Sequence, residues 1–400
     1  MKIKSTSLLI AGALFGAAVM PAHASNEAMM DLLKVLRDRG TITSQDYELL
    51  ANAAKADKEA GEAVAMKVEK ASTASKSLEW AERIKLKGDM RARYEDQDAV
   101  DSSNMPDDER RFRIRARLGA YAQVNETTKA GIRLVTTVGS ATSTNQTLEN
   151  NFSSTDVGID LGYIDWAPTA LGGNTHFIFG KMKKPWESVS GMVWDGDTNP
   201  EGVAIKSKLN AGGVTLIPSV GYYTLDDNGT DSFSEDSHLG HAQLAAVMGK
   251  TKVGVSYFGF ESANTDAMGN FTGPSEEERM FQLFGETAIP STPVTVFANY
   301  VHNTNADAPG DDDNAWSLGA KAKMGSFKLS YEYLDLGVNA LNDNFDNSDF
   351  GNDSKGSIIK AAYKINNSFT AQATYYTSDT NINNDDTEAD LLHLDLKVKF

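Results

Sequence analysis

Apolar and charged side chains alternate with a period of two from Arg83 onward. Between Arg83 and Arg93 every odd-numbered position is charged, and every even-numbered position is apolar or glycine. The run 111–118 repeats this pattern, with arginine at each odd-numbered position. Because successive side chains of a β-strand point to opposite faces, the pattern predicts strands with one apolar face and one basic face.

The alternation continues to the C-terminus. The last run carries leucine, valine and phenylalanine on one face and ends at Phe400, and in this it resembles the terminal strand of barrels inserted into the bacterial outer membrane. Sixteen strands are predicted, over 83–95, 109–124, 128–138, 157–167, 175–183, 202–209, 214–224, 237–248, 251–261, 278–288, 293–302, 315–324, 327–336, 356–365, 368–378 and 389–400.

The predicted connections alternate between short turns and long polar loops. Short turns fall at 125–127, 210–213, 249–250, 289–292, 325–326 and 366–367. Long loops fall at 96–108, 139–156, 184–201, 225–236, 262–277, 303–314, 337–355 and 379–388. This sorting is typical of a transmembrane β-barrel, and a soluble sandwich has no reason to show it. The predicted fold class is therefore an all-β transmembrane barrel of about 16 antiparallel strands at 83–400, after a short α-helical periplasmic segment.

The first 24 residues have the organisation of a signal peptide. Lys2 and Lys4 precede an apolar stretch from Leu8 to Met20, and 22–24 form a small-x-small cleavage site. These features predict export of a bacterial protein whose mature chain starts at Ser25.

Residues 25–82 have a helical pattern. Apolar residues from Met29 to Leu36 follow i, i+3, i+4, i+7, and Gly40 fits the position after the helix. Thr43 and Asp46 predict a capping box that starts a second helix. A weak heptad pattern over 50–78 leaves two interpretations open: a periplasmic coiled coil that helps to trimerise the protein, or a partly ordered tether.

Composition narrows the possible functions. Acids outnumber bases by 55 to 38, which argues against binding to nucleic acid, and the absence of cysteine excludes disulfides, thiolate metal sites and cysteine nucleophiles. The sequence contains no phosphate-binding loop, dinucleotide fingerprint or nucleophile elbow. His238 and His241 lie on opposite faces of a predicted strand and cannot ligate one ion. We therefore expect no enzyme, no catalytic residue, no metal and no cofactor.

A barrel of sixteen strands leaves an aqueous lumen, which the basic faces would line. Rings or ladders of arginine and lysine favour anions in pores, and few acids share these faces, namely Asp89, Glu95 and Glu109. Candidate pore-lining and anion-binding residues are Lys85, Lys87, Arg91, Arg93, Arg111, Arg113, Arg115, Arg117 and Arg133. Two alternatives remain, a non-selective general diffusion porin and a closed structural or adhesive barrel. We expect loop 139–156 to constrict the lumen.

Many of the acids fall in the predicted long loops. One interpretation is bridging by divalent cations to lipopolysaccharide phosphates. A second is calcium binding by Asp311–Asp313 and 343–353, which are rich in hard oxygen ligands. A third is plain solvation of the loops.

Several segments resemble the putative porins of Gram-negative bacteria related to the phosphate-selective porins. The resemblance rests on 31–33, 40–43, 86–94, 111–119, 180–183 and Phe400. It implies a sixteen-stranded homotrimeric porin of the outer membrane, passing small anions or other small hydrophilic solutes. It also implies that an arginine ladder conducts the anion, here matched by Arg91, Arg93, Arg111, Arg113, Arg115 and Arg117. The acidic loops depart from the phosphate-specific pattern, and Lys181, Lys183 and Lys184 are the nearest candidate for a lysine cluster at an entrance.

Overall fold

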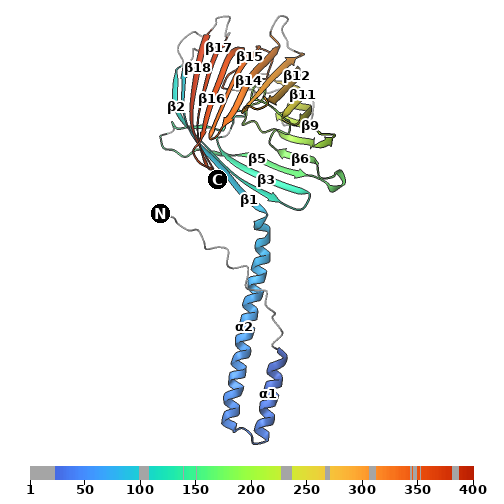
Figure 1. Ribbon diagram of the computed structural model, residues 1–400, viewed down its shortest axis with the longest axis vertical. Coiled ribbons are helices and arrows are strands. Elements are labelled where there is room, and N and C mark those ends of the chain that lie inside the picture. Colours follow the sequence, from blue (N-terminus) through green and yellow to red (C-terminus); the bar gives the residue numbers. More distant parts are fainter. Residues whose placement is uncertain are drawn as a thin grey trace. The chain divides into compact units, whose positions relative to one another are not determined.

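The chain forms a helical unit and a β-unit that divide at Glu82 and Arg83 (Figure 1). The computed structural model describes residues 23–98, 108–137, 139–149, 151–226, 237–265, 271–305, 312–342, 345, 349–351, 353–380 and 387–400. The predicted signal peptide lies almost wholly outside these residues, as do most of loops 96–108 and 225–236. None of the described helices is long and apolar enough to cross a membrane.

The helical unit contains α1 (His23–Asp38) and α2 (Ser44–Glu82). The predicted end of α1 is confirmed, because Gly40 has φ +72° and its N–H donates to the carbonyl of Arg37. The predicted capping box is also confirmed. The N–H of Asp46 donates to the hydroxyl of Thr43, and the Asp46 carboxylate accepts from the Thr43 N–H. The hydroxyl of Thr43 also donates to the Asp46 carboxylate at 2.6 Å, and this bond together with the one from the Thr43 N–H lowers the pKa of Asp46.

The β-unit is a closed antiparallel barrel of sixteen strands, with two short additional strands, β4 (Gln146–Thr147) and β8 (Leu209–Ala211). The sixteen are β1 (Ile84–Asp98), β2 (Glu109–Gln123), β3 (Thr128–Thr136), β5 (Val157–Trp166), β6 (Thr175–Lys181), β7 (Glu201–Ser207), β9 (Val214–Asp226), β10 (Ser237–Met248), β11 (Thr251–Thr265), β12 (Phe271–Ala288), β13 (Val294–Asn303), β14 (Asn314–Met324), β15 (Phe327–Leu336), β16 (Ser354–Lys364), β17 (Phe369–Thr380) and β18 (Thr387–Lys399).

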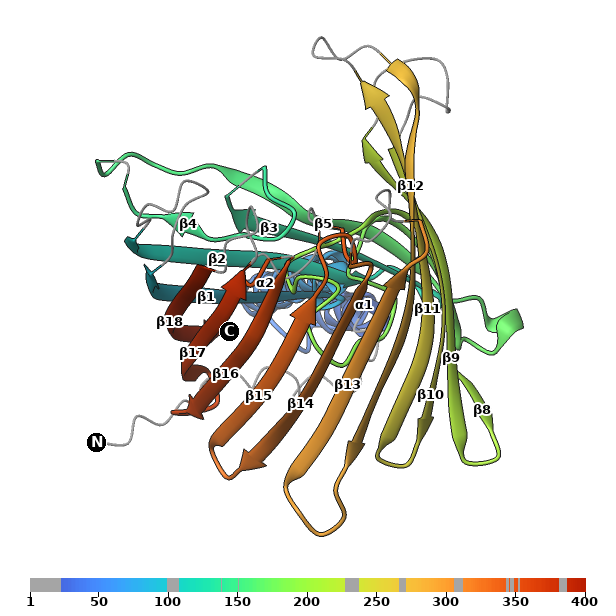
Figure 2. The same cartoon turned by 90° about the horizontal axis from the view of Figure 1, so that it is seen from above.

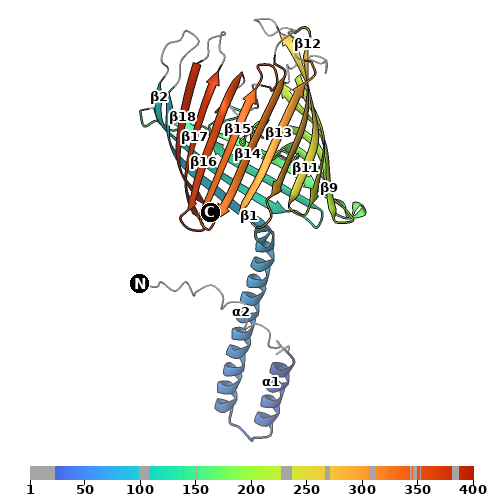
Figure 3. The ribbon, with the colours of Figure 1, turned by 45° about the horizontal axis from the view of Figure 1, so that its top comes forward.

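The predicted fold class is thus confirmed, and every predicted strand is present with small shifts of its ends. The short turns lie together at the lower end of the barrel in Figure 3. One predicted loop differs: much of 262–277 continues β11 and β12 as a longer hairpin.

Ring closure is made by β1, which pairs with β2 on one side and with β18 on the other (Figure 2). At the seam the N–H of Gly88 donates to the carbonyl of Phe400 (2.9 Å), and the N–H of Phe400 donates back to Gly88 (3.1 Å). The Phe400 ring lies where a side chain at position 88 would be, since an ideal Cβ on Gly88 would come within 2.4 Å of it. Closure removes the exposed sheet edge that an open array would have.

The two faces of the barrel follow the sequence alternation. Large apolar residues such as Leu86, Phe112 and Leu318 are exposed on the outside. Inward positions hold buried polar residues on some strands, including Gln243, Gln282 and Asn299, and buried aromatic rings on others. The predicted apolar exterior and polar lumen are therefore present.

Substitution of Gly88 by valine should impair closure of the barrel. The new side chain would overlap the ring of Phe400 and would also clash with the carbonyl oxygen of Arg117. The expected result is a smaller fraction of protein that migrates as folded barrel on unheated SDS gels. Gly240→Val is the matched control, since Gly240 also faces outward from a strand and its nearest neighbour is 4.0 Å from an ideal Cβ. Equal folded fractions for the two variants would contradict this role of Gly88.

Candidate functional site

The predicted arginine ladder lies on the inner wall formed by β1 and β2. The register pairs Arg91 with Arg115 and Arg93 with Arg113, and it places Asp89 opposite Arg117. All of these side chains are buried or half-buried, whereas Met90, Phe112 and Leu118 among the residues that alternate with them are exposed. The sequence pattern therefore brings the central arginines of β1 and β2 together as expected.

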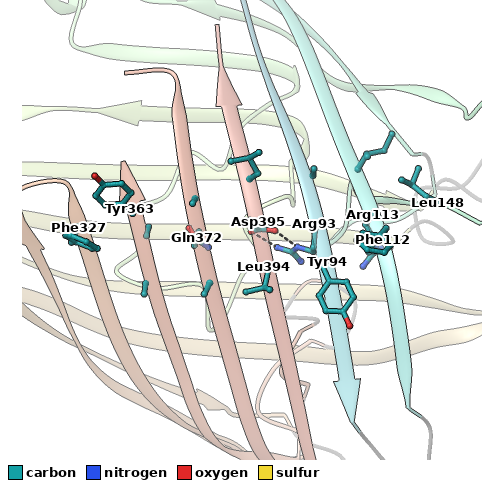
Figure 4. Close-up of a pocket in the computed structure, with 17 residues that line it drawn as sticks. Arg93, Tyr94, Phe112, Arg113, Leu148, Phe327, Tyr363, Gln372, Leu394 and Asp395 are labelled. Atoms are coloured by element: carbon teal, nitrogen blue, oxygen red, sulfur yellow. Dashed lines mark hydrogen bonds and ion pairs between the residues drawn. The ribbon is translucent and has the colours of Figure 1, made fainter. Parts of the chain in front are cut away.

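The arginines are paired with more acids than the sequence pattern indicated. Arg93 forms a two-pronged pair with Asp395 of β18, from Nε to Oδ1 at 2.7 Å and from Nη2 to Oδ2 at 3.2 Å (Figure 4). Arg133 of β3 pairs with Asp160 of β5. Glu95 accepts from Arg111 and Arg113, and it also contacts His393 at 3.1 Å.

The expectation of few acid partners was therefore wrong. It counted only acids on the same two strands, whereas Asp395, Asp160 and Asp197 reach the ladder from elements distant in sequence. Two wall arginines, Arg115 and Arg117, pair both with Asp89 of β1 and with Asp197.

Asp197 belongs to the connection 182–200 between β6 and β7, which folds into the lumen. The apolar side chains of this connection are buried against aromatic rings that point inward from the opposite wall. Trp194 packs on Phe258 and Phe260 at centroid distances of 5.0 and 6.0 Å. Its polar groups also bond to that wall, since Asn299 of β13 donates to Ser190 at 3.0 Å. This inward loop therefore spans the lumen from one wall to the other.

Two further connections reach the lumen. In 139–149, Thr144 and Asn145 are buried, and Asn145 accepts a hydrogen bond from Nε of Arg91 at 3.1 Å. In 337–353, Asp349 accepts from the hydroxyl of Tyr376 at 3.1 Å. Loop 139–156, which was expected to constrict the lumen, thus places side chains in it. The inward loop 182–200, which the sequence pattern did not single out, places more buried side chains there.

A cavity of about 420 Å³ is lined by both the arginine wall and the inward loop. Seven bases line it, namely Arg91, Arg93, Arg115, Arg117, Lys183, Lys360 and Lys397. Four carboxylates line it, namely Asp195, Asp197, Glu332 and Asp349. Within the described parts of the chain, Arg91, Lys183 and Lys360 form no ion pair. Positive charge is therefore in excess around this cavity.

The other predicted site residues lie away from the cavity. Lys85 and Lys87 are exposed near the start of β1, and the ammonium of Lys87 lies 5.8 Å from the ring centre of Tyr121. Arg113 lies opposite Arg93, and Arg111 lies opposite Glu95, nearer the connection between β1 and β2. Lys183 was named only as part of the candidate lysine cluster at an entrance, and Lys360 and Lys397 were not among the candidate pore-lining residues. Lys360 and Lys397 lie on β16 and β18, whose inner faces lack the run of arginines that marks β1 and β2.

Burial and neighbouring charges set the protonation of the inward loop. Desolvation raises the pKa of Asp195 to about 7. Asp197 is also buried, but Arg115 and Arg117 and the hydroxyl of Thr144 outweigh burial and lower its pKa to about 2. Burial lowers the pKa of Lys184 to about 8. Asp197 is therefore ionised at neutral pH, and Asp195 is close to half protonated.

A second cavity of about 590 Å³ lies on the outer face (Figure 4). Small residues such as Ala92, Ala361 and Ala373 form its floor, with Phe327 and Phe112 among its lining rings. Arg93, Arg113, Gln372 and Asp395 also belong to its lining, but the surface that they and their neighbours expose to the cavity is mostly apolar, so it offers little to a hydrophilic solute. As predicted, His238 and His241 lie on opposite faces of β10: His241 packs inward on Trp186, and His238 packs on Tyr222 of the outer face.

Comparison with known proteins agrees with this architecture. Residues 98–275 match the family described as "Putative porin". OmpF of Salmonella typhi, solved in complex with daunomycin, aligns over 79% of this chain and 97% of its own with 11% identity and a TM-score of 0.53. OprB of Pseudomonas putida aligns over 80% and 95% with 10% identity and a TM-score of 0.53. No curated protein sequence matches.

The family match and the shared fold support an outer-membrane porin channel. The similarity to solved structures is one of fold, and the family match lies over β2–β11.

Anion preference should fall as pH rises from about 6 to about 8, because Asp195 lines the cavity and loses its proton over this range. Deprotonation of Lys184 near the upper end acts in the same direction. Reversal potentials in a KCl gradient across planar bilayers measure the effect. Asp195→Asn should flatten the profile around neutral pH, and an unaltered profile in this variant would show that another group titrates.

Proposed function

We propose that this porin conducts small hydrophilic solutes with a preference for anions, through the cavity between the arginine wall and the inward loop. The observation that supports this most directly is the excess of cations there, since Arg91, Lys183 and Lys360 have no ion-pair partner in the described residues. Unpaired basic groups facing water attract anions and repel cations. The predicted ladder contributes chiefly through these unpaired groups rather than through all of its arginines.

A non-selective diffusion porin is the second candidate, and the pairing of the arginines favours it. Arg93, Arg115, Arg117 and Arg133 each have a carboxylate partner, so their charge is largely compensated within the wall. A lumen with balanced charge would discriminate by size more than by sign.

Substitution of Arg91 by glutamine distinguishes the two candidates. Glutamine can keep a hydrogen bond to Asn145 while removing the charge, so the ratio of chloride to potassium permeability should fall by roughly threefold for one charge facing a water-filled cavity. The control is Arg110→Gln, because Arg110 is exposed on the outer side of β2 and pairs with Asp96 at 2.9 Å.

Reversal potentials in a KCl gradient give the permeability ratio for each variant. Equal ratios for wild type and Arg91→Gln would favour the non-selective channel. Added phosphate then tests one anion class, because a phosphate-preferring channel would show saturable block of chloride current.

We also infer that the mature protein starts at Ser25, places residues 25–82 in the periplasm and assembles as a homotrimer in the outer membrane beside lipopolysaccharide. Intact-mass measurement of the exported chain tests the first point. Light scattering of the detergent-extracted protein tests the assembly.

A further inference from the structure

The carboxylate of Asp197 makes the contacts with the barrel wall that a bound oxyanion would make. It accepts from Nη1 of Arg115 at 3.2 and 3.4 Å and from Nη1 of Arg117 at 3.2 Å. It also accepts from the hydroxyl of Thr144 at 2.8 Å and from the Thr144 N–H at 3.3 Å. Guanidinium, hydroxyl and backbone N–H donors converging on two oxygens are the groups with which proteins bind carboxylates and phosphates.

Asp197 differs from the other acids of the ladder in where it is attached. Asp89, Asp395 and Asp160 lie on β1, β18 and β5, where the backbone is fixed by the hydrogen bonds of the sheet. Asp197 lies on the inward loop, outside the sheet, and lines the cavity in direct contact with Arg115 and Arg117. Its donors, by contrast, include two arginines of a single strand, which would remain in position without it.

We propose that Arg115, Arg117 and Thr144 form a binding site for a small carboxylate, and that Asp197 is a tethered occupant of this site. The inference rests on the anion path proposed above and specifies a ligand class for it. A free carboxylate such as formate has the same charge and the same pair of oxygens as the Asp197 side chain. In the wild-type protein the site is filled, and passing anions meet the unpaired Arg91 and Lys183 instead.

The loop around Asp197 is held by contacts that do not use its carboxylate. The N–H of Asp197 donates to the Asp195 carboxylate at 2.6 Å, and its carbonyl accepts from Asn199 at 2.8 Å. Asn199 also donates to Asp160 at 2.7 Å, and the N–H of Asp195 donates to the carbonyl of Phe345 at 2.9 Å. Removing only the carboxylate should therefore leave the loop in place and a space of carboxylate size beside the arginines.

Two variants of Asp197 test the proposal. Asp197→Ala removes the charge and leaves the space, whereas Asp197→Asn removes the charge and fills the space. Both should raise the ratio of chloride to potassium permeability, by roughly threefold for the loss of one negative charge beside the cavity. Unheated SDS gels establish that both variants fold as barrels.

Formate is then added equally to both sides at constant ionic strength. In Asp197→Ala it should bind in the vacated space and return the permeability ratio toward the wild-type value with saturation. Asp197→Asn and the wild type should show no saturable response, because their sites are filled.

The proposal of a carboxylate site would be overturned if the folded Asp197→Ala channel showed no saturable response of its permeability ratio to formate. The same holds if its response equalled that of Asp197→Asn. In that case a raised permeability ratio in both variants would still support the anion path. Unchanged ratios in both folded variants would count against the anion path itself, so the two failures are distinguishable.

Discussion

Charge compensation of the arginines is the interaction on which the interior of this barrel depends. Transfer of an ion from water into a protein costs several kcal/mol, and a buried ion is stable only when a counter-charge and further hydrogen bonds are provided. Arg93, Arg115 and Arg133 are more than nine-tenths buried, and each has a carboxylate partner. Because these partners come from β18, β1 and β5, each ion pair joins two neighbouring strands, and the Arg93–Asp395 pair does so where β1 meets β18 and the barrel closes.

The inward loop contributes to this charge compensation. One side of the loop is apolar, with Trp186 and Trp194 packed against Phe258. The other side carries Asp197, which is drawn to Arg115 and Arg117. A loop that packs against the apolar wall and forms ion pairs with the basic wall has little freedom to leave the lumen. The loop therefore contacts both walls and bounds the cavity on the side opposite the sheet, and the Asp197 pairs add to packing and backbone contacts that already hold it there.

The sequence predicts the barrel well because the signal is local. Alternation with a period of two assigns each residue to a face without any knowledge of its partners, so the strands and the inward position of Arg91 and Arg115 follow directly. Charge pairing does not follow, because Arg93 and Asp395 are about three hundred positions apart in the chain and become neighbours only when β1 meets β18. Loop 182–200 carries no periodic pattern, so nothing in the sequence marks Asp197 as a lumen residue. The composition of this loop did indicate that it is buried. It contains two tryptophans and two methionines, which are unusual in a connection exposed to water.

The chain has a negative net charge, whereas the lining of the cavity has an excess of positive charge. Screening by salt explains why the negative charge elsewhere does not cancel the effect of the lining. Acids exceed bases by 17 over the whole sequence, yet charges more than about 8 Å apart in water are largely screened at physiological salt. An ion in the cavity therefore responds to the lining and not to the chain as a whole. That lining holds seven bases and four carboxylates, and Asp195 carries its full negative charge only above neutral pH. Selectivity thus depends on a small local excess, which one substitution in the cavity can alter more than many substitutions outside it.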